Sequence, residues 1–267
     1  MGFDVLGIGV MVGIAIAFIL TGFPHGAMDL WISHRAGYWR SWPSFVVFHL
    51  IYVACAALCF MVFSVWESLA LLAFLAFSIV HFADDWDDSL PQAVRLLLSF
   101  SAITLPFIAH PIEVANIFGV MLGEGSSATQ AELGSLNQYL PMVLVGSLGA
   151  VAVIDWRQLP LPATVFAGAF FLPPLIYFGL YFALWHSPLH LHRHADLITS
   201  KSKRTVLVAY ALVAAVMAGT VTTLAMPAIS SLSIADHIIR MIFWGLAALT
   251  VPHMILLART GAPIKHI

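Results

Sequence analysis

Residues 44–64 read SFVVFHLIYVACAALCFMVFS and contain no Asp, Glu, Lys or Arg. A helix needs roughly 20 largely apolar residues to cross the hydrocarbon core of a bilayer. The apolar residues form a continuous run without the alternation of a half-buried strand. Trp42-Pro43 precedes the run and Trp66-Glu67 follows it. This stretch therefore predicts a membrane-spanning α-helix.

The composition extends that prediction to the whole chain. Of 267 residues, 61% are hydrophobic and 9% are charged, and the mean hydropathy is +0.97, whereas soluble domains carry roughly 25% charged residues. The net charge of −2 comes from 11 basic and 13 acidic residues, which gives no basic field for nucleic acid. We expect an integral membrane protein whose surroundings are lipid, with no nucleic-acid partner.

Seven further apolar runs resemble the first, so the predicted fold is all-α: a polytopic helical membrane bundle of about eight spans. No linker divides the chain, so residues 1–267 are expected to form a single membrane-embedded domain. The spans are expected near residues 5–23, 44–64, 67–83, 93–110, 138–154, 165–190, 205–226 and 237–257.

Four histidines stand out because polar residues at membrane depth are costly and usually functional. Imidazole is a favoured ligand of zinc, copper, iron and nickel. These histidines are His25, His81, His186 and His190. They predict a buried metal site.

His186 and His190 are spaced i, i+4, which places both imidazoles on one face of a helix. Pro188 lies between them and removes a backbone donor, so the pair is expected at a kink. A structural, hydrogen-bonded role is the alternative to ligation for both. His192 and His194 follow closely and are alternatives to His190, although their basic neighbours favour a tail that faces lipid headgroups.

The other two histidines have polar neighbours. Asp29 follows His25 by four residues and is expected to accept the second imidazole proton of His25, as outer carboxylates orient metal ligands; a helix N-cap is the alternative. His81 ends an apolar run and could instead reach towards water. The acidic run Asp84-Asp85-Trp86-Asp87-Asp88 favours a solvated loop over a cation site. His253 is a further candidate participant.

A shared metal site constrains the topology. With eight strictly alternating spans, His25 and His81 lie at one membrane face, and His186 and His190 lie at the other. All ligands must approach one metal to about 2 Å. We therefore expect an additional crossing or re-entrant segment between residues 84 and 185. Residues 160–173, before Pro173-Pro174, are the first candidate, and 111–123 are the second.

The additional crossing between residues 84 and 185 also places seven basic residues on one side of the membrane. By the positive-inside rule that side is cytoplasmic. The protein is then expected in the cell (inner) membrane, with its N-terminus outside and its C-terminus in the cytoplasm. The residues concerned are Arg35, Arg40, Lys201, Lys203, Arg204, Arg259 and Lys265.

Aromatic residues cluster just before the histidine pair, and an apolar cavity for a long substrate is the functional interpretation. Aromatic belts at the membrane interface and ordinary packing are the alternative. The candidates are Tyr177, Phe178, Tyr181, Phe182 and Trp185.

The four histidines limit which metals and which reactions the predicted site favours. Four neutral histidines with no carboxylate ligand leave a divalent metal with its full charge, which favours iron or copper in oxygen chemistry, with zinc still open. The chain contains no Gly-rich phosphate loop, GxSxG, HExxH or CxxC motif. Nucleotide-driven, serine-hydrolase and zinc-peptidase reactions are therefore disfavoured.

Four segments together resemble the Brp/Blh family of membrane β-carotene 15,15′-dioxygenases. They are His25-Gly26-Ala27-Met28-Asp29, His81-Phe82, Trp185-His186-xxx-His190 and Pro252-His253-Met254. The resemblance runs from residue 22 to 256. The chain departs from the family pattern at Ala83, where the family has glycine, and in the histidine-rich continuation after His190.

The resemblance implies an iron(II) enzyme that cleaves the central double bond of β-carotene with O2 and yields two all-trans-retinal molecules. It implies His25, His81, His186 and His190 as iron ligands. The carotenoid would enter from the bilayer, and the retinal would pass to a microbial rhodopsin. The alternatives are a membrane di-iron desaturase or hydroxylase and a non-enzymatic metal or proton carrier lined by His25, Asp29 and His81.

Overall fold

A computed structural model describes residues 7–122, 138–224 and 234–260, and in these ranges the regular structure is entirely helical. The all-α prediction is confirmed. The longer helices are α1 (Gly7–Ala27), α3 (Trp42–Val65), α4 (Glu67–Phe82), α5 (Gln92–Ala109), α8 (Leu140–Asp155), α12 (Lys201–Leu224) and α13 (Ile234–Thr260). The shorter ones are α2 (Asp29–Arg35), α6 (Pro111–Leu122), α9 (Pro160–Phe171), α10 (Pro174–Tyr181) and α11 (Ser187–Arg193), with short turns η2 (Ala83–Asp85), η3 (Trp156–Gln158), η4 (Phe182–His186) and η5 (Ala195–Ile198).

The chain divides into two compact units. Met1–Leu71 and Phe182–Ile267 make up the first unit, and Leu72–Tyr181 makes up the second. The division falls inside α4 and between α10 and η4, so the first unit joins the two ends of the chain. The prediction of a single domain stays a prediction.

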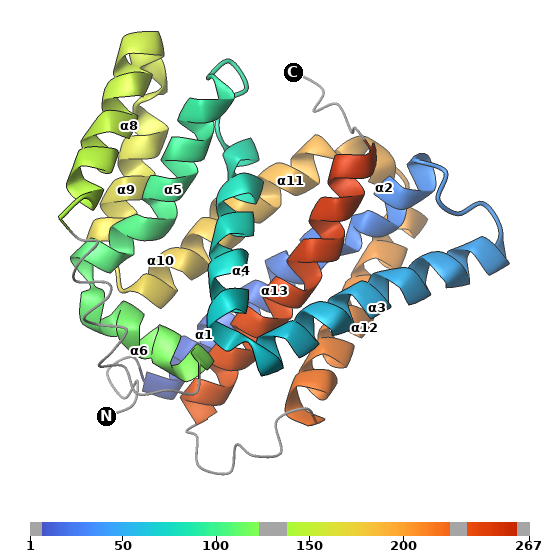
Figure 1. The fold of residues 1–267 in the computed structure, drawn as a ribbon. Helices are drawn as coiled ribbons and strands as arrows, with labels where there is room; N and C mark the ends of the chain where they lie inside the picture. The colour runs from blue at the N-terminus through green and yellow to red at the C-terminus, as the bar shows by residue number, and fades with distance from the viewer. Residues whose placement is uncertain (1–6, 123–137, 225–233, 261–267) are drawn as a thin grey trace. The chain divides into compact units, whose positions relative to one another are not determined.

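In the first unit, α1 packs against α12, α13 and α11, and α3 packs along α13 (Figure 1). The end of α1 and the start of α2 contribute Ala27, Met28 and Ile32 to a buried apolar cluster. Leu207 of α12 and Leu256 of α13 complete the same cluster. The apolar contacts therefore fix the α1–α2 junction between two long helices.

In the second unit, α5 packs against α8 and α9. The α5–α8 contact includes a buried hydrogen bond of 3.2 Å from the Ser101 hydroxyl to that of Ser147. The Tyr177 hydroxyl donates to the Ala102 carbonyl at 3.0 Å, which ties α10 to α5. Polar groups in this unit thus pair between helices, as buried polar groups require.

Within the part of the chain that the structure describes, four helical segments are long and apolar enough to cross a membrane: Trp42–Phe63, Glu67–Asp85, Gln92–Ala109 and Asp236–Thr260. The first contains an 18-residue apolar window in which no residue is buried within the protein. Leu50, Ile51 and Leu58 of α3 are each more than half exposed, and such an apolar surface is costly in water. Lipid around α3 removes that cost, in agreement with a membrane bundle.

The predicted span at 165–190 is wrong as one continuous helix. α9 ends at Phe171, α10 begins at Pro174, and a π turn follows at Phe182–His186. Residues 160–171 form the separate helix α9, and residues 111–122 form α6, both short apolar helices; an additional membrane crossing at either one stays a prediction. Pro173-Pro174 ends α9 because proline cannot donate the hydrogen bond that would continue it.

Candidate metal centre

His25 lies in the last turn of α1, directly after Pro24, and is 6% exposed. Gly26 follows His25, and a small residue at such a position can let a neighbouring helix come close. A Cβ at Gly26 would meet nothing within 4 Å, so no close contact requires this glycine. The position of His25 comes instead from the packing of α1 against α11, α12 and α13.

His186 and His190 are presented by the π turn η4 and by α11, which follows it without a break. Both are buried, at 2% and 9% exposure. Pro188 lies in the first turn of α11, where its missing N–H is tolerated. The kink expected at Pro188 is therefore not present at that residue, and the departure from regular α-helix geometry is the π turn that ends at His186, a feature that is frequent at functional sites.

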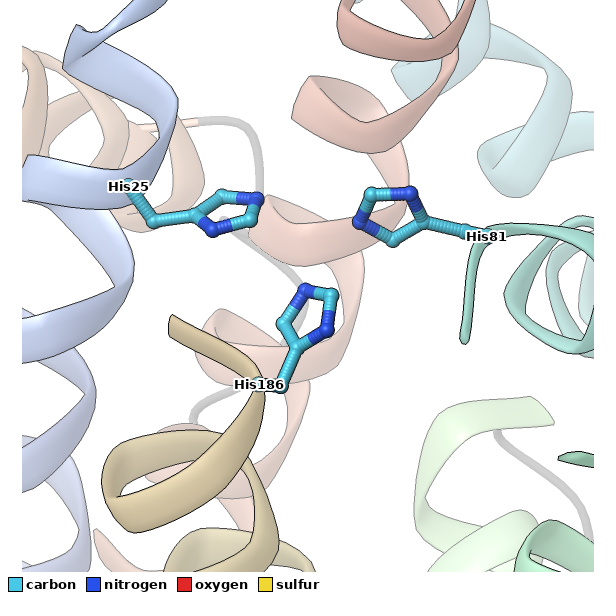
Figure 2. Close-up of side chains that lie close together, drawn as sticks. All are labelled: His25, His81 and His186. Carbon is cyan, nitrogen blue, oxygen red and sulfur yellow. The ribbon is translucent and has the colours of Figure 1, made fainter. Parts of the chain in front are cut away.

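The imidazoles of His25, His186 and His190 lie together in the first unit. The ring centroid of His25 is 4.1 Å from that of His190 and 4.7 Å from that of His186. Figure 2 shows the His25 ring extending from α1 and the His186 ring extending from the segment before α11 into the same space. Residues far apart in the sequence thus form one imidazole cluster.

His253 of α13 joins this cluster. Its ring centroid is 5.0 Å from that of His25 and 5.2 Å from that of His190. One ligand nitrogen each from His25, His190 and His253 lies within 4.8 Å of the other two. Two nitrogens on opposite sides of one metal are at most about 4.2 Å apart, so small ring rotations bring the three within binding distance. The cluster can bind a metal ion.

Asp29 is buried beside the cluster and accepts two hydrogen bonds. His253 Nδ1 lies 2.7 Å from Asp29 Oδ1, and the Tyr52 hydroxyl donates to Asp29 Oδ2 at 2.7 Å. We expected Asp29 to orient His25, and the structure places it against His253. The reason is local: the Met28 N–H bonds to the His25 carbonyl three residues back, so the backbone tightens between His25 and Asp29.

His81 ends α4 in the second unit, where it is 9% exposed. Its role as a ligand stays a prediction. The acidic run after it is only partly a solvated loop. Asp87 is exposed, and Asp88 pairs with Arg95 at 2.9 Å, but Asp85 is 5% exposed and accepts a hydrogen bond of 2.6 Å from the Tyr181 hydroxyl.

The two histidines that follow His190 differ from each other. His192 is exposed, as expected for an interfacial tail. His194 is buried, its Nδ1 lies 3.0 Å from the His190 carbonyl, and its ring centroid is 4.5 Å from that of His190. The expectation of a headgroup-facing side chain is therefore wrong for His194, because the chain turns inward at the end of α11.

The predicted substrate-binding aromatics separate into two groups. Tyr177 and Tyr181 are buried in the second unit, with their hydroxyls bound to Ala102 and Asp85. Phe182 is buried in the first unit, with its ring centroid 5.1 Å from that of His186 and 6.0 Å from that of His25. Phe178 and Trp185 are half-buried. Phe182 is thus the aromatic candidate in ring contact with the cluster.

Sequence reasoning missed Tyr52, and it considered Tyr181 only as a substrate-binding residue; the hydroxyl of each donates to a buried carboxylate. A signal was present in the spacing, because Asp29 follows His25 by four residues and Asp85 follows His81 by four residues. Each of these carboxylates is buried and each accepts a tyrosine hydroxyl. The two units therefore share a local pattern of histidine, aspartate and tyrosine.

Comparison with known families adds the decisive observation. The family described as beta-carotene 15,15'-dioxygenase matches residues 16–259, nearly the whole chain. The chain belongs to the beta-carotene 15,15'-dioxygenase family. The match includes His25, His81, His186, His190 and His253. No curated protein and no solved structure was found to match the chain.

Membership in this dioxygenase family agrees with the chemistry of the cluster. Dioxygenases handle O2, and the family's substrate is an apolar polyene. A buried set of neutral nitrogen donors suits iron or copper, the metals used in oxygen chemistry. The long apolar helices agree with a substrate that is held in the membrane.

Proposed function

We propose that the chain is an iron(II)-dependent enzyme that cleaves the central 15,15′ double bond of β-carotene with O2. The two products are all-trans-retinal, each of which receives one oxygen atom from O2. The buried cluster of His25, His186, His190 and His253 in a member of this family carries the proposal. Sequence resemblance adds His81 as a proposed ligand.

Iron bound by His25, His81, His186 and His190 would supply the activation of O2. The residues of the chain position and shield the reactants. Imidazole is a ligand that suits iron. The Phe182 ring beside His25 and His186 provides an apolar wall for a polyene. Cleavage at the central bond then follows from how deep the polyene lies, a matter of positioning.

The proposal includes the surroundings of the enzyme. The carotenoid would enter from the bilayer, and the retinal would leave to a microbial rhodopsin. We propose the cell (inner) membrane as the location, with the N-terminus outside and the C-terminus in the cytoplasm. Basic residues near the ends of α2 and α12 support this orientation by the positive-inside rule.

The test is expression in a bacterial host that accumulates β-carotene, with retinal in the extracts measured by chromatography. We expect retinal from the intact chain and none from His186→Ala. His192→Ala is the matched control, because His192 is an exposed histidine close to His186 in the sequence. Unchanged carotene with folded, iron-loaded protein would contradict the proposed reaction.

Iron content separates the alternatives. A mononuclear dioxygenase binds one iron per chain, and a di-iron desaturase or hydroxylase binds two. A carrier would move metal or protons across vesicles without forming any product. Iron quantified in the purified protein, with product analysis on the same sample, distinguishes these three outcomes.

A further inference from the structure

The buried chain of contacts from Tyr52 through Asp29 to His253 has no role in the function proposed so far. Its three members come from α3, α2 and α13 of the first unit. Asp29 and the His253 side chain are each about 4% exposed, and both hydrogen bonds to the carboxylate are 2.7 Å long. A carboxylate in so dry a place is costly unless its lone pairs are used.

The hydrogen bond to Asp29 determines which nitrogen of His253 carries the proton. Asp29 Oδ1 accepts a hydrogen bond from the Nδ1–H of His253, so the lone pair of the neutral ring is on Nε2. The His253 ring lies 5.0 Å from that of His25 and 5.2 Å from that of His190. A histidine that donates one N–H to a carboxylate and lies beside other imidazoles has the arrangement of a metal-bound histidine.

Tyr52 limits the movement of the carboxylate. Its hydroxyl occupies Oδ2 and leaves Oδ1 to His253. The Asp29 side chain cannot rotate without losing one of these bonds. Since Tyr52 lies on α3, the contact also fixes the distance between α3 and the α1–α2 junction.

We propose that Tyr52 and Asp29 are positioning residues that hold His253 as a ligand of the same metal as His25 and His190. The inference rests on the metal-binding part of the proposed function and does not depend on the substrate. It adds α13 to the helices that hold the metal and gives Tyr52 a task beyond packing.

Metal binding by the full-length purified protein tests the proposal without reference to activity. The probe is Co(II), with its dissociation constant and visible absorption measured, because band intensity reports coordination number. We expect His253→Ala to weaken Co(II) binding and to change the spectrum. Asp29→Asn should weaken binding by about 10–100-fold, the usual effect of losing a carboxylate behind a metal-bound histidine. Tyr52→Phe should weaken it less, because Asp29 remains.

Matched controls separate positioning from general damage. His192→Ala, Asp196→Asn and Tyr38→Phe make the same chemical changes at exposed positions and should leave binding unchanged. Added imidazole should restore the spectrum of His253→Gly. Because Tyr52→Phe removes one hydroxyl only, it tests the chain of contacts even where a variant of Asp29 does not fold.

Co(II) affinity and spectrum unchanged in His253→Ala would overturn the proposal. Equal affinity of Tyr52→Phe and the intact chain would overturn the role of Tyr52. If retinal forms normally while these binding constants do not change, only this inference fails. If the binding constants change as expected but no retinal forms, the proposed reaction fails and the ligand assignment stands.

Discussion

The Ser187 hydroxyl donates a hydrogen bond to the backbone carbonyl of Thr21. Ser187 is fully buried between His186 and the proline of α11, and Thr21 lies one turn before His25. This bond joins the two segments that carry three of the clustered imidazoles. It fixes the register of α11 against α1 at the level of the site.

Ser187→Ala should therefore loosen the site without removing a ligand. We expect a loss of about 1 kcal/mol in the free energy of unfolding, the usual net value of one hydrogen bond, and a decrease in retinal formation. Thermal unfolding in detergent measures the first effect. Ser202→Ala, at an exposed position in α12, is the control. An unchanged melting temperature would show that the Ser187 bond contributes nothing to stability.

Replacement of His190 tests the ligand set in α11. His190→Ala should lose bound iron and retinal formation together, because a buried nitrogen donor is removed from the cluster. His192→Ala, two residues away and exposed, should keep both. Iron per chain, measured on the purified proteins, is the first readout. Loss of iron in His192→Ala together with retention of iron in His190→Ala would show that His192, and not His190, is the ligand.

His81 requires a test of its own because its role as a ligand comes from the sequence. We expect His81→Ala to bind less iron and to form no retinal. Ser78→Ala, one turn earlier in α4 and also buried, controls for disturbed packing in that helix. Full iron content in folded His81→Ala would remove His81 from the ligand set.

Removal of the metal should abolish the reaction reversibly. Treatment of the purified protein with a chelator should stop retinal formation, and Fe(II) should restore it. Zn(II) should occupy the same nitrogen donors without restoring activity, because zinc has no redox chemistry. Activity in thoroughly chelated, iron-free protein would contradict the proposed cofactor.

Gly26→Ala should be tolerated. The added Cβ has open space around it, and alanine is favoured over glycine inside a helix by about 1 kcal/mol. We expect an equal or higher melting temperature and normal iron content. A lower melting temperature would show that α1 needs the flexibility of glycine before Met28.

The sequence was sufficient to select His25, His186 and His190, which the structure brings together, because polar residues in apolar helices are conspicuous. It was insufficient for the partner of Asp29, since His253 is separated from Asp29 by 224 positions in the sequence. Tyr52 in an apolar helix resembles any packed aromatic until its hydroxyl is seen on a carboxylate. The π turn could not be foreseen, because hydrophobic periodicity within five residues does not distinguish it from an α-turn.

The π turn makes the number of residues between Phe182 and His186 as important as their identity. A π turn accommodates one residue more than an α turn of the same height, and each α-helical residue accounts for about 100° of rotation. Deletion of one residue at 183–185 would turn the Phe182 ring away from the His186 and His25 imidazoles while α11 kept its place. In this segment the chain length itself determines which side chain covers the clustered histidines.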